Sequence, residues 1–254
     1  MTMPSPAWTH IQLNKPSTPE SGYRTDEDFL SDISAALREE ILELYNAGLR
    51  NIQIDDPNLA FFCYSDWLSV LQTHGMDPTK WLDLHIKAHD DVVRDLPSDL
   101  NIGLHICRGN YKGGVHIASG GYEDIAAKLF NQTAYKTFYL EFDSPRSGDF
   151  GPLKHLPEGK TVVLGVVTTK FVEMEDLAEL KKRVLAAADV IAEARGITTQ
   201  RALDCLAVSP QCGFSSDHSG AGVGMTVQAQ WEKLELLQRL AEELWPGWRS
   251  QKAD

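Results

Sequence analysis

The stretch "NIGLHICRGN", residues 101–110, is a short apolar run that stops abruptly at glycine and asparagine. A run of this length, bounded by turn-forming residues, predicts a β-strand. His105 and Cys107 stand two positions apart near its end, and side chains two apart in a strand point to the same face. The pair has two interpretations: ligands of a shared metal site, or ordinary core residues, since cysteine is among the most buried residue types.

Outward from this strand, helical and strand patterns alternate along the chain. Upstream, "TDEDFLSDISAALREEILELYNAG" (25–48) has apolar residues every three or four positions, and Thr25 with Asp28 resembles a capping box. It leads into the strand "RNIQIDD" (50–56), which ends in Asp55 and Asp56. Helical patterns over 67–75 and 79–96 then lead into the strand at 101–109.

The same order continues downstream. A helix over 122–132 and the strand "TFYLEFD" (137–143) are followed by the β-branched run "TVVLGVVTT" (161–169). A helix over 173–196, with Gly196 as its stop, precedes the strand "CLAVSPQCGF" (205–214), and a last helix is predicted over 226–245. The polar stretch 12–26 is predicted to be a loop.

This alternation predicts an α/β fold with a parallel sheet and crossover helices, either closed as a barrel or open and doubly wound. No G-x-G-x-x-G fingerprint follows a strand, and the unusual polar residues fall where strands end. The carboxyl ends of the strands are where a TIM (β/α)8 barrel keeps its active site. We therefore predict one barrel domain over residues 1–254.

Composition narrows the partners and the compartment. The 254 residues carry a formal net charge of −12, and the 24 basic residues are scattered, which disfavours nucleic acid as a partner. Neither a run of eighteen apolar residues nor a secretory signal pattern is present, so we expect no membrane partner and a cytoplasmic location. The 4 cysteines are too few to staple the chain; we interpret Cys63 and Cys205 as packing residues.

Two other strand ends supply side chains of metal-ligand type. Glu141 lies in "YLEFDSPRSG" and Cys212 in "SPQCGF". With His105 and Cys107 they give one imidazole, two thiolates and one carboxylate at the same barrel mouth, a set that zinc prefers. A purely structural role stays open, because no ligand pair follows a short zinc-finger interval.

Five motifs in order, each at a strand end, resemble the catalytic barrel of cobalamin-independent methionine synthase: "IQIDDP", "LHICRGN", "YLEFDSPRSG", "VVLGVVTTK" and "LAVSPQCGF". The arrangement is most similar to single-barrel homologues in which the His-x-Cys pair precedes Arg-Gly-Asn. This resemblance implies a TIM barrel of the methionine synthase/uroporphyrinogen decarboxylase type. It also implies four zinc ligands, which are His105, Cys107, Glu141 and Cys212.

The resemblance also implies roles for neighbouring residues. Asp55 matches the aspartate that holds the amino group of homocysteine, and Asp56 beside it is a further substrate-binding candidate; the alternative for both is to cap the turn or helix that follows the strand. Arg108, Asn110 and Arg146 lie beside the site and are candidates for binding a substrate carboxylate or phosphate, with a solvated or turn-stabilising role as the alternative.

The sequence departs from the family pattern in two places. Lys170, in "TTK", stands where the synthases have a histidine that shuttles protons, which makes it the candidate catalytic residue here. Lysine ordinarily titrates far above neutral pH and is a poor proton shuttle, although it can bind an anion. The opening "PSPAWTHIQ" (4–12) resembles the family's third strand, so we expect a barrel that lacks its first two βα units and exposes two edges.

These observations support three functional hypotheses. The first is zinc-dependent methyl transfer to a homocysteine-like thiol, with a methyl-tetrahydrofolate as donor and methionine as product. The second keeps the zinc-bound thiol and changes the electrophile, for example to an epoxide. The third is a non-catalytic, truncated barrel that binds zinc or associates with an intact homologue or, through its exposed edges, with another copy of itself.

Overall fold

A computed structural model describes residues 1–12, 18, 20–110, 116–214 and 225–250, and its centre is a six-stranded parallel sheet. The strands are β1 (Thr2–Pro4), β2 (Asn51–Asp55), β3 (Asn101–Ile106), β4 (Thr137–Glu141), β5 (Thr161–Val167) and β6 (Leu206–Pro210). They lie side by side in chain order, and every neighbouring pair is parallel. All six carboxyl ends therefore meet at one edge of the sheet.

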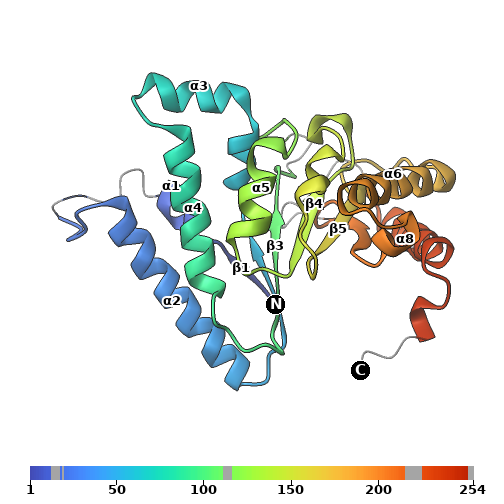
Figure 1. Ribbon diagram of the computed structural model, residues 1–254, viewed down its shortest axis with the longest axis horizontal. Helices are drawn as coiled ribbons and strands as arrows, with labels where there is room; N and C mark the ends of the chain where they lie inside the picture. The colour runs from blue at the N-terminus through green and yellow to red at the C-terminus, as the bar shows by residue number, and fades with distance from the viewer. Residues whose placement is uncertain (13–17, 19, 111–115, 215–224, 251–254) are drawn as a thin grey trace.

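Helices connect the strands and cover the sheet from both flanks (Figure 1). They are α1 (Pro6–Gln12), α2 (Asp26–Asn46), α3 (Ser65–Thr73), α4 (Pro78–Val93), α5 (Glu123–Gln132), α6 (Leu177–Arg195), α7 (Thr199–Leu203) and α8 (Val227–Leu244). Short 3-10 helices occupy Leu59–Cys63, Pro145–Ser147, Gly151–His155 and Trp248–Ser250. The expected alternation of strands and helices is therefore present.

Local capping chemistry sets where the long helices begin and end. Thr25 accepts a hydrogen bond from the backbone of Asp28 (3.1 Å) at the start of α2, as the capping-box pattern predicts. Gly196 adopts the left-handed conformation that ends α6 (φ 64°), where a side chain would be strained. Thr226 caps α8 through the backbone of Ala229, so the helix expected over 226–245 occupies Val227–Leu244.

The opening of the chain differs from the expectation. The strand placed in residues 4–12 is wrong in position: β1 covers Thr2–Pro4 and a helix follows it. Ser5 accepts a hydrogen bond from the backbone of Trp8 and Pro6 occupies the first helical position, a combination typical of a helix start. In the stretch expected to be a loop, 12–26, turn structure follows at 20–22, while 13–17 and 19 lie outside the described residues.

One hydrophobic core joins the sheet to its helices. Ile54, Leu104, Phe138 and Leu164 come from four successive strands, and each is fully buried. The sheet has two strands fewer than the eight of a closed (β/α)8 barrel, and in the part of the chain that the structure describes β1 and β6 each pair with a single neighbour. Among the described helices, none is long and apolar enough to cross a membrane.

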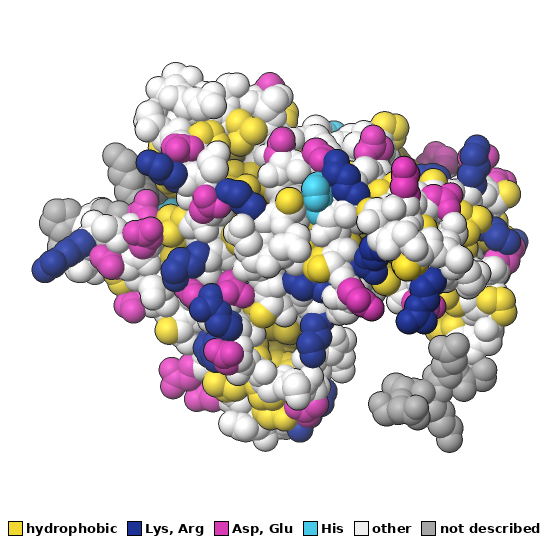
Figure 2. All heavy atoms as spheres, viewed as in Figure 1, with side chains coloured by type: hydrophobic (Ala, Val, Ile, Leu, Met, Phe, Trp, Pro, Cys, Tyr) yellow, Lys and Arg dark blue, Asp and Glu magenta, His cyan; other side chains and the backbone are white. Residues whose placement is uncertain are grey.

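The surface agrees with the scattered distribution of charge in the sequence. On the face shown in Figure 2, Lys and Arg side chains are interspersed with Asp and Glu. No basic stripe that could follow a phosphate backbone is visible on this face.

Buried histidines next to the sheet make folding sensitive to acid. His85 is fully buried, with Nε2 3.3 Å from Nδ1 of His10, and burial lowers its pKa from 6.5 to about 3. Below pH 6.5 His85 binds a proton in the unfolded chain, whereas in the folded chain it stays neutral down to about pH 3. The free energy of unfolding therefore falls as the pH drops from 6.5 to about 3.

Replacing His85 with Phe should reduce this acid sensitivity. We expect the loss of unfolding free energy between pH 6.5 and 4.5 to become shallower by up to about 1.4 kcal/mol per pH unit, measured by urea denaturation. His74→Phe, at an exposed position, is the control. An unchanged slope in His85→Phe would show that other groups cause the acid sensitivity.

Candidate metal centre

The ends of β3 and β4 bring three of the candidate ligands together. His105 lies inside β3 in register with Asp55 of β2, and Cys107 follows the last residue of β3. Glu141 is the last residue of β4 and is fully buried. Its Oε1 accepts a hydrogen bond from the backbone N–H of Arg108 (3.1 Å), which ties the two strand ends to each other.

Cys212 reaches the same place from the end of β6 because the backbone passes very close to β5. Gln211 donates its backbone N–H to the carbonyl of Val167 (2.9 Å). A Cβ at Gly165 would lie 2.7 Å from Cα of Gln211, so this close passage requires glycine. The turn that follows carries Cys212 toward Cys107, and the two Sγ atoms are 3.9 Å apart.

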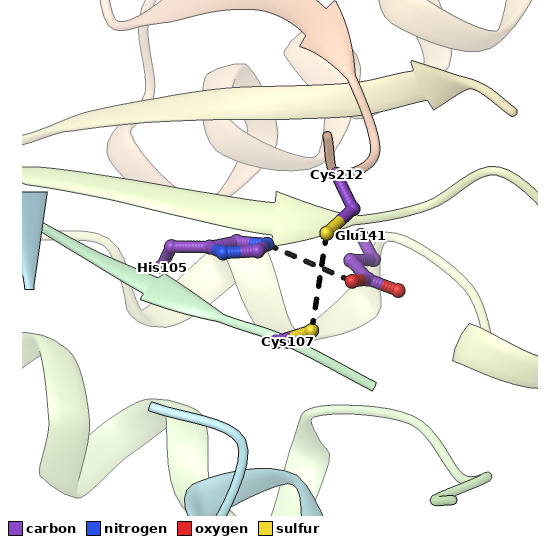
Figure 3. A group of neighbouring side chains, drawn as sticks. All are labelled: His105, Cys107, Glu141 and Cys212. Atoms are coloured by element: carbon purple, nitrogen blue, oxygen red, sulfur yellow. Dashed lines mark hydrogen bonds and ion pairs between the residues drawn. The ribbon is translucent and has the colours of Figure 1, made fainter. Parts of the chain in front are cut away.

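The four donor atoms fit a tetrahedral metal of zinc size. They all lie within 4.8 Å of one another (Figure 3). Two thiolates bound at the usual Zn–S length of about 2.3 Å stand about 3.8 Å apart, and the observed Sγ–Sγ distance is 3.9 Å. The His105 Nε2 to Glu141 Oε1 distance of 3.6 Å is likewise close to what two bonds of about 2.1 Å require.

Asp55 sets the orientation of the imidazole. Its Oδ1 is hydrogen-bonded to Nδ1 of His105, which turns Nε2 toward Glu141 and the thiols. Burial opposes a charge on His105, but the hydrogen bonds with Asp55 and Glu141 outweigh it and raise the pKa to about 10. The metal-free site therefore holds a proton on His105 that a metal must displace.

The two thiols are hydrogen-bonded to each other. This contact and burial raise the pKa of Cys107, while the same contact lowers the pKa of Cys212. A metal would remove the proton that the pair shares, because thiolate is the form that binds metal. The other two cysteines do not take part: Cys63 packs in the core, where burial raises its pKa to about 11, and Cys205 contacts Arg195.

A buried charge network surrounds the outer oxygen of Glu141. Arg146 donates to Glu141 Oε2 (2.8 Å) and to Asp143 Oδ1 (3.0 Å). Lys170 is 3% exposed and its Nζ lies 3.4 Å from Asp143 Oδ2. Because the Arg146 guanidinium binds Oε2 of Glu141, Oε1 is left to face the other donors. Lys170 does not contact Glu141 in this network and is connected to it through Asp143 and Arg146. The sequence analysis predicted that Arg146 lies beside the site. It did not predict a role for Asp143, although Asp143 is only two positions after Glu141.

Asn110 and Gln211 join the loops over the site. Asn110 donates to Thr169 Oγ1 (3.2 Å) and to the carbonyl of Gly213 (2.7 Å), and its own oxygen accepts from Gln211 Nε2 (3.4 Å). Gln211 also accepts from the backbone of Thr169 and contacts His105 Nε2 through its carbonyl (3.2 Å). The sequence analysis did not predict a role for Gln211 at the site, although its position directly before the candidate ligand Cys212 could have indicated one.

The side chains of two predicted substrate-binding residues, Asp56 and Arg108, do not face the site. Asp56 is fully buried, accepts from the backbone of Asn58 and Leu59, and pairs with His89 Nε2 (2.6 Å). The side chain of Arg108 is also fully buried, with its guanidinium 4.3 Å from the centre of the Tyr122 ring. The structure gives Asp56 the turn-capping role that the sequence left open, and gives the Arg108 side chain a packing role.

The fold and the site together define a class: a parallel α/β barrel lacking two strands, with a thiolate-rich donor cluster at its carboxyl edge. Residues 10–225 match the family described as the cobalamin-independent synthase catalytic domain. The chain belongs to this family, which confirms the resemblance read from the five motifs.

Individual relatives agree with this assignment. The chain is 33% identical over 247 residues to the uncharacterised protein YxjG of Bacillus subtilis, matching 96% of this chain and 61% of YxjG. It superimposes with a TM-score of 0.68 and 25% identity on the structure of a candidate vitamin-B12-independent methionine synthase from Listeria monocytogenes, covering 96% of this chain and 63% of that one.

A B12-independent methionine synthase from Shewanella, solved with selenomethionine, has the same fold (TM-score 0.66, 20% identity) and is covered over 63% of its length. The chain thus spans less than two thirds of the relatives it matches. Its fold is an incomplete TIM barrel, as expected.

Asp55→Ala should weaken metal binding about tenfold to a hundredfold, because carboxylates that orient a ligating imidazole have effects of this size. The measurement is a Co²⁺ titration followed by thiolate-to-cobalt absorption. Asp99→Ala, an exposed carboxylate before the other end of β3, should bind Co²⁺ like the parent. Equal affinity in Asp55→Ala and the parent would remove the orienting role of Asp55.

Proposed function

We propose that this protein transfers a methyl group to a homocysteine-like thiol at a zinc ion held by His105, Cys107, Glu141 and Cys212. The observation that carries the proposal is the spacing of these nitrogen, oxygen and sulfur donors, which matches tetrahedral zinc. Family membership supports the substrates, since cobalamin-independent methionine synthases act on homocysteine and a methyl-tetrahydrofolate. We place the reaction in methionine biosynthesis or a closely similar pathway.

Zinc in this site would supply Lewis acidity that lowers the pKa of a bound substrate thiol, so that it is present as a thiolate. The chain's own residues do the rest. Glu141 and the two cysteines provide negative charge that holds the cation, while Arg146 offsets part of that charge from behind Glu141. His105 and Glu141 are buried, while Cys107 and Cys212 are half-buried, which leaves the sulfur side of the cluster accessible to a substrate thiol.

Asp55 is suited to hold the substrate as well as His105. Its Oδ1 pairs with His105, and the side chain is still 37% exposed, which leaves Oδ2 for the ammonium group of an amino acid. In the transfer itself, the substrate sulfur attacks the methyl carbon, the new S–C bond replaces the N–C bond of the donor, and the donor nitrogen takes up a proton.

Lys170 favours a second candidate reaction, the addition of the thiolate to another electrophile such as an epoxide. It is held by Asp143 at the position where the synthases have their proton-shuttling histidine. Its ammonium group is suited to hold an anionic group of the electrophile or the oxygen that an opening epoxide leaves. The two reactions share the zinc and the thiol and differ only in the carbon that is attacked.

Purified protein should contain about one zinc per chain by elemental analysis. Cys212→Ser should lose most of it, because the hydroxyl is a poor ligand for zinc at neutral pH. Cys205→Ser, which changes a cysteine remote from the cluster, should keep its zinc. Full zinc content and unchanged thiol binding in Cys212→Ser would rule out the proposed ligand set.

Thiol consumption separates the candidate reactions. With homocysteine and methyl-tetrahydrofolate polyglutamate we expect methionine to form, and Cys107→Ser should reduce turnover by at least a hundredfold, in line with loss of a catalytic metal ligand. A parallel series with other thiols and small epoxides tests the second reaction. If zinc is present and no thiol is consumed in either series, the non-catalytic alternative replaces both.

A further inference from the structure

The pairing of β3 with β4 stops just before the candidate ligand at the end of β4. The last pair in register is Ile106 with Leu140, so Glu141 follows where this pairing has ended. Phe142 donates its backbone N–H to the carbonyl of Gly165 on β5 (2.9 Å). Because successive residues of a parallel strand bond to opposite neighbours, the N–H and C=O of Glu141 face the side of β3. Glu141 is fully buried, so both groups need a partner there.

The hydroxyl of Tyr122 is that partner. Tyr122 directly precedes α5 and is fully buried. Its hydroxyl accepts a hydrogen bond from the Glu141 backbone N–H (2.9 Å) and donates one to the Glu141 carbonyl (3.3 Å). It also accepts from Nε of Arg108 (3.2 Å). A hydroxyl has one donor and two acceptor lone pairs, so these three bonds use its full capacity.

Arg108 holds the Tyr122 side chain in this position. Its guanidinium lies over the ring, 4.3 Å from the centre, while its Nε binds the hydroxyl. Arg108 is fully buried, and its Nη1 and Nη2 atoms have no hydrogen-bond partner among the described residues. Burying a charge in this way costs stability. An apolar side chain of similar length would fill the space without this cost, so the guanidinium has a role beyond packing.

The loop before Tyr122 is tied to the other side of the same carboxylate. Gly120 donates its backbone N–H to the carbonyl of Arg146 (2.8 Å), and Arg146 binds Glu141 Oε2 (2.8 Å). Oε1 accepts from the backbone of Arg108 (3.1 Å). The backbone and both carboxylate oxygens of Glu141 are therefore held by one connected group of residues around Tyr122.

We propose that Tyr122, held by Arg108, is a positioning residue for Glu141 and sets how tightly and in what geometry the cluster binds its metal ion. This inference rests on the proposed zinc site. The hydroxyl fixes the peptide groups of Glu141, so the carboxylate leaves the strand end at a fixed point with Oε1 toward the other donors. Without the hydroxyl, these buried peptide groups lose their partner, and the strand end moves to recover one. Metal affinity is sensitive to such outer partners of a ligand.

The test is Tyr122→Phe in the full chain, which removes one oxygen atom and keeps the ring on which Arg108 stacks. We expect Co²⁺ affinity to fall at least tenfold, and the d–d absorption of bound Co²⁺, which reports coordination geometry, to change. Tyr135→Phe is the matched control, because Tyr135 is also fully buried and its hydroxyl is hydrogen-bonded to His89 Nδ1 (3.0 Å). Both variants should unfold at a lower temperature than the parent, but only Tyr122→Phe should change metal binding.

A second variant tests the role of Arg108. Arg108→Met removes the hydrogen bond to the Tyr122 hydroxyl and keeps the backbone N–H that binds Glu141, so Co²⁺ affinity should fall in the same direction. Because Arg108 acts through Tyr122, the double variant should bind Co²⁺ no more weakly than Tyr122→Phe alone.

Three outcomes would overturn the proposal. These are equal Co²⁺ affinity and absorption in Tyr122→Phe and the parent, an equal loss of affinity in Tyr135→Phe, and losses in Tyr122→Phe and Arg108→Met that add in the double variant. Failure of the proposed function is distinguishable from these. A parent protein that binds neither zinc nor Co²⁺ removes the zinc site and this inference together, whereas a parent that binds Co²⁺ no better than Tyr122→Phe removes only the role of Tyr122.

Discussion

The structure depends on the parallel alignment of its strands, which delivers one imidazole, one carboxylate and two thiols to a single point at the carboxyl edge of the sheet. Glu141 is fully buried, and its four-donor cluster spans no more than 4.8 Å. Burying several groups that become negative is costly unless a cation or a hydrogen-bond network compensates for them. Arg146 compensates at Oε2 of Glu141, while Oε1, which accepts from the backbone of Arg108, faces the other donors that would bind a metal ion.

The requirements of this cluster extend into the surrounding fold. Gly165 has no side chain because β6 and the turn after it must pass close to β5 to present Cys212. Asp55 must be in register with His105 on the neighbouring strand to orient the imidazole. Asn110, Thr169 and Gln211 then tie three loops together above the donors, so that residues remote in the chain keep the cluster in place.

The fold is at once sufficient for the site and incomplete as a barrel. The ligands come from β3, β4 and the end of β6, all of which are paired with neighbours inside the chain. The two strands that a closed barrel would add lie on the far side, between β6 and β1. The candidate metal site therefore needs none of the strands that a closed barrel would add to this sheet.

The sequence by itself determined the alternation of strands and helices, because periodicity and capping residues such as Thr25 are local signals. It also determined the donor residues, since strand ends of a parallel sheet must meet. Only the tertiary structure decided the roles of Asp56 and Arg108. They directly follow Asp55 and Cys107 in the chain, yet Asp56 accepts from the backbone at the start of a 3-10 helix and Arg108 stacks on Tyr122. It alone placed the first strand at Thr2–Pro4, with a helix directly after it. The physical reason is that side-chain direction and edge pairing depend on contacts between residues far apart in the chain, which no local pattern encodes.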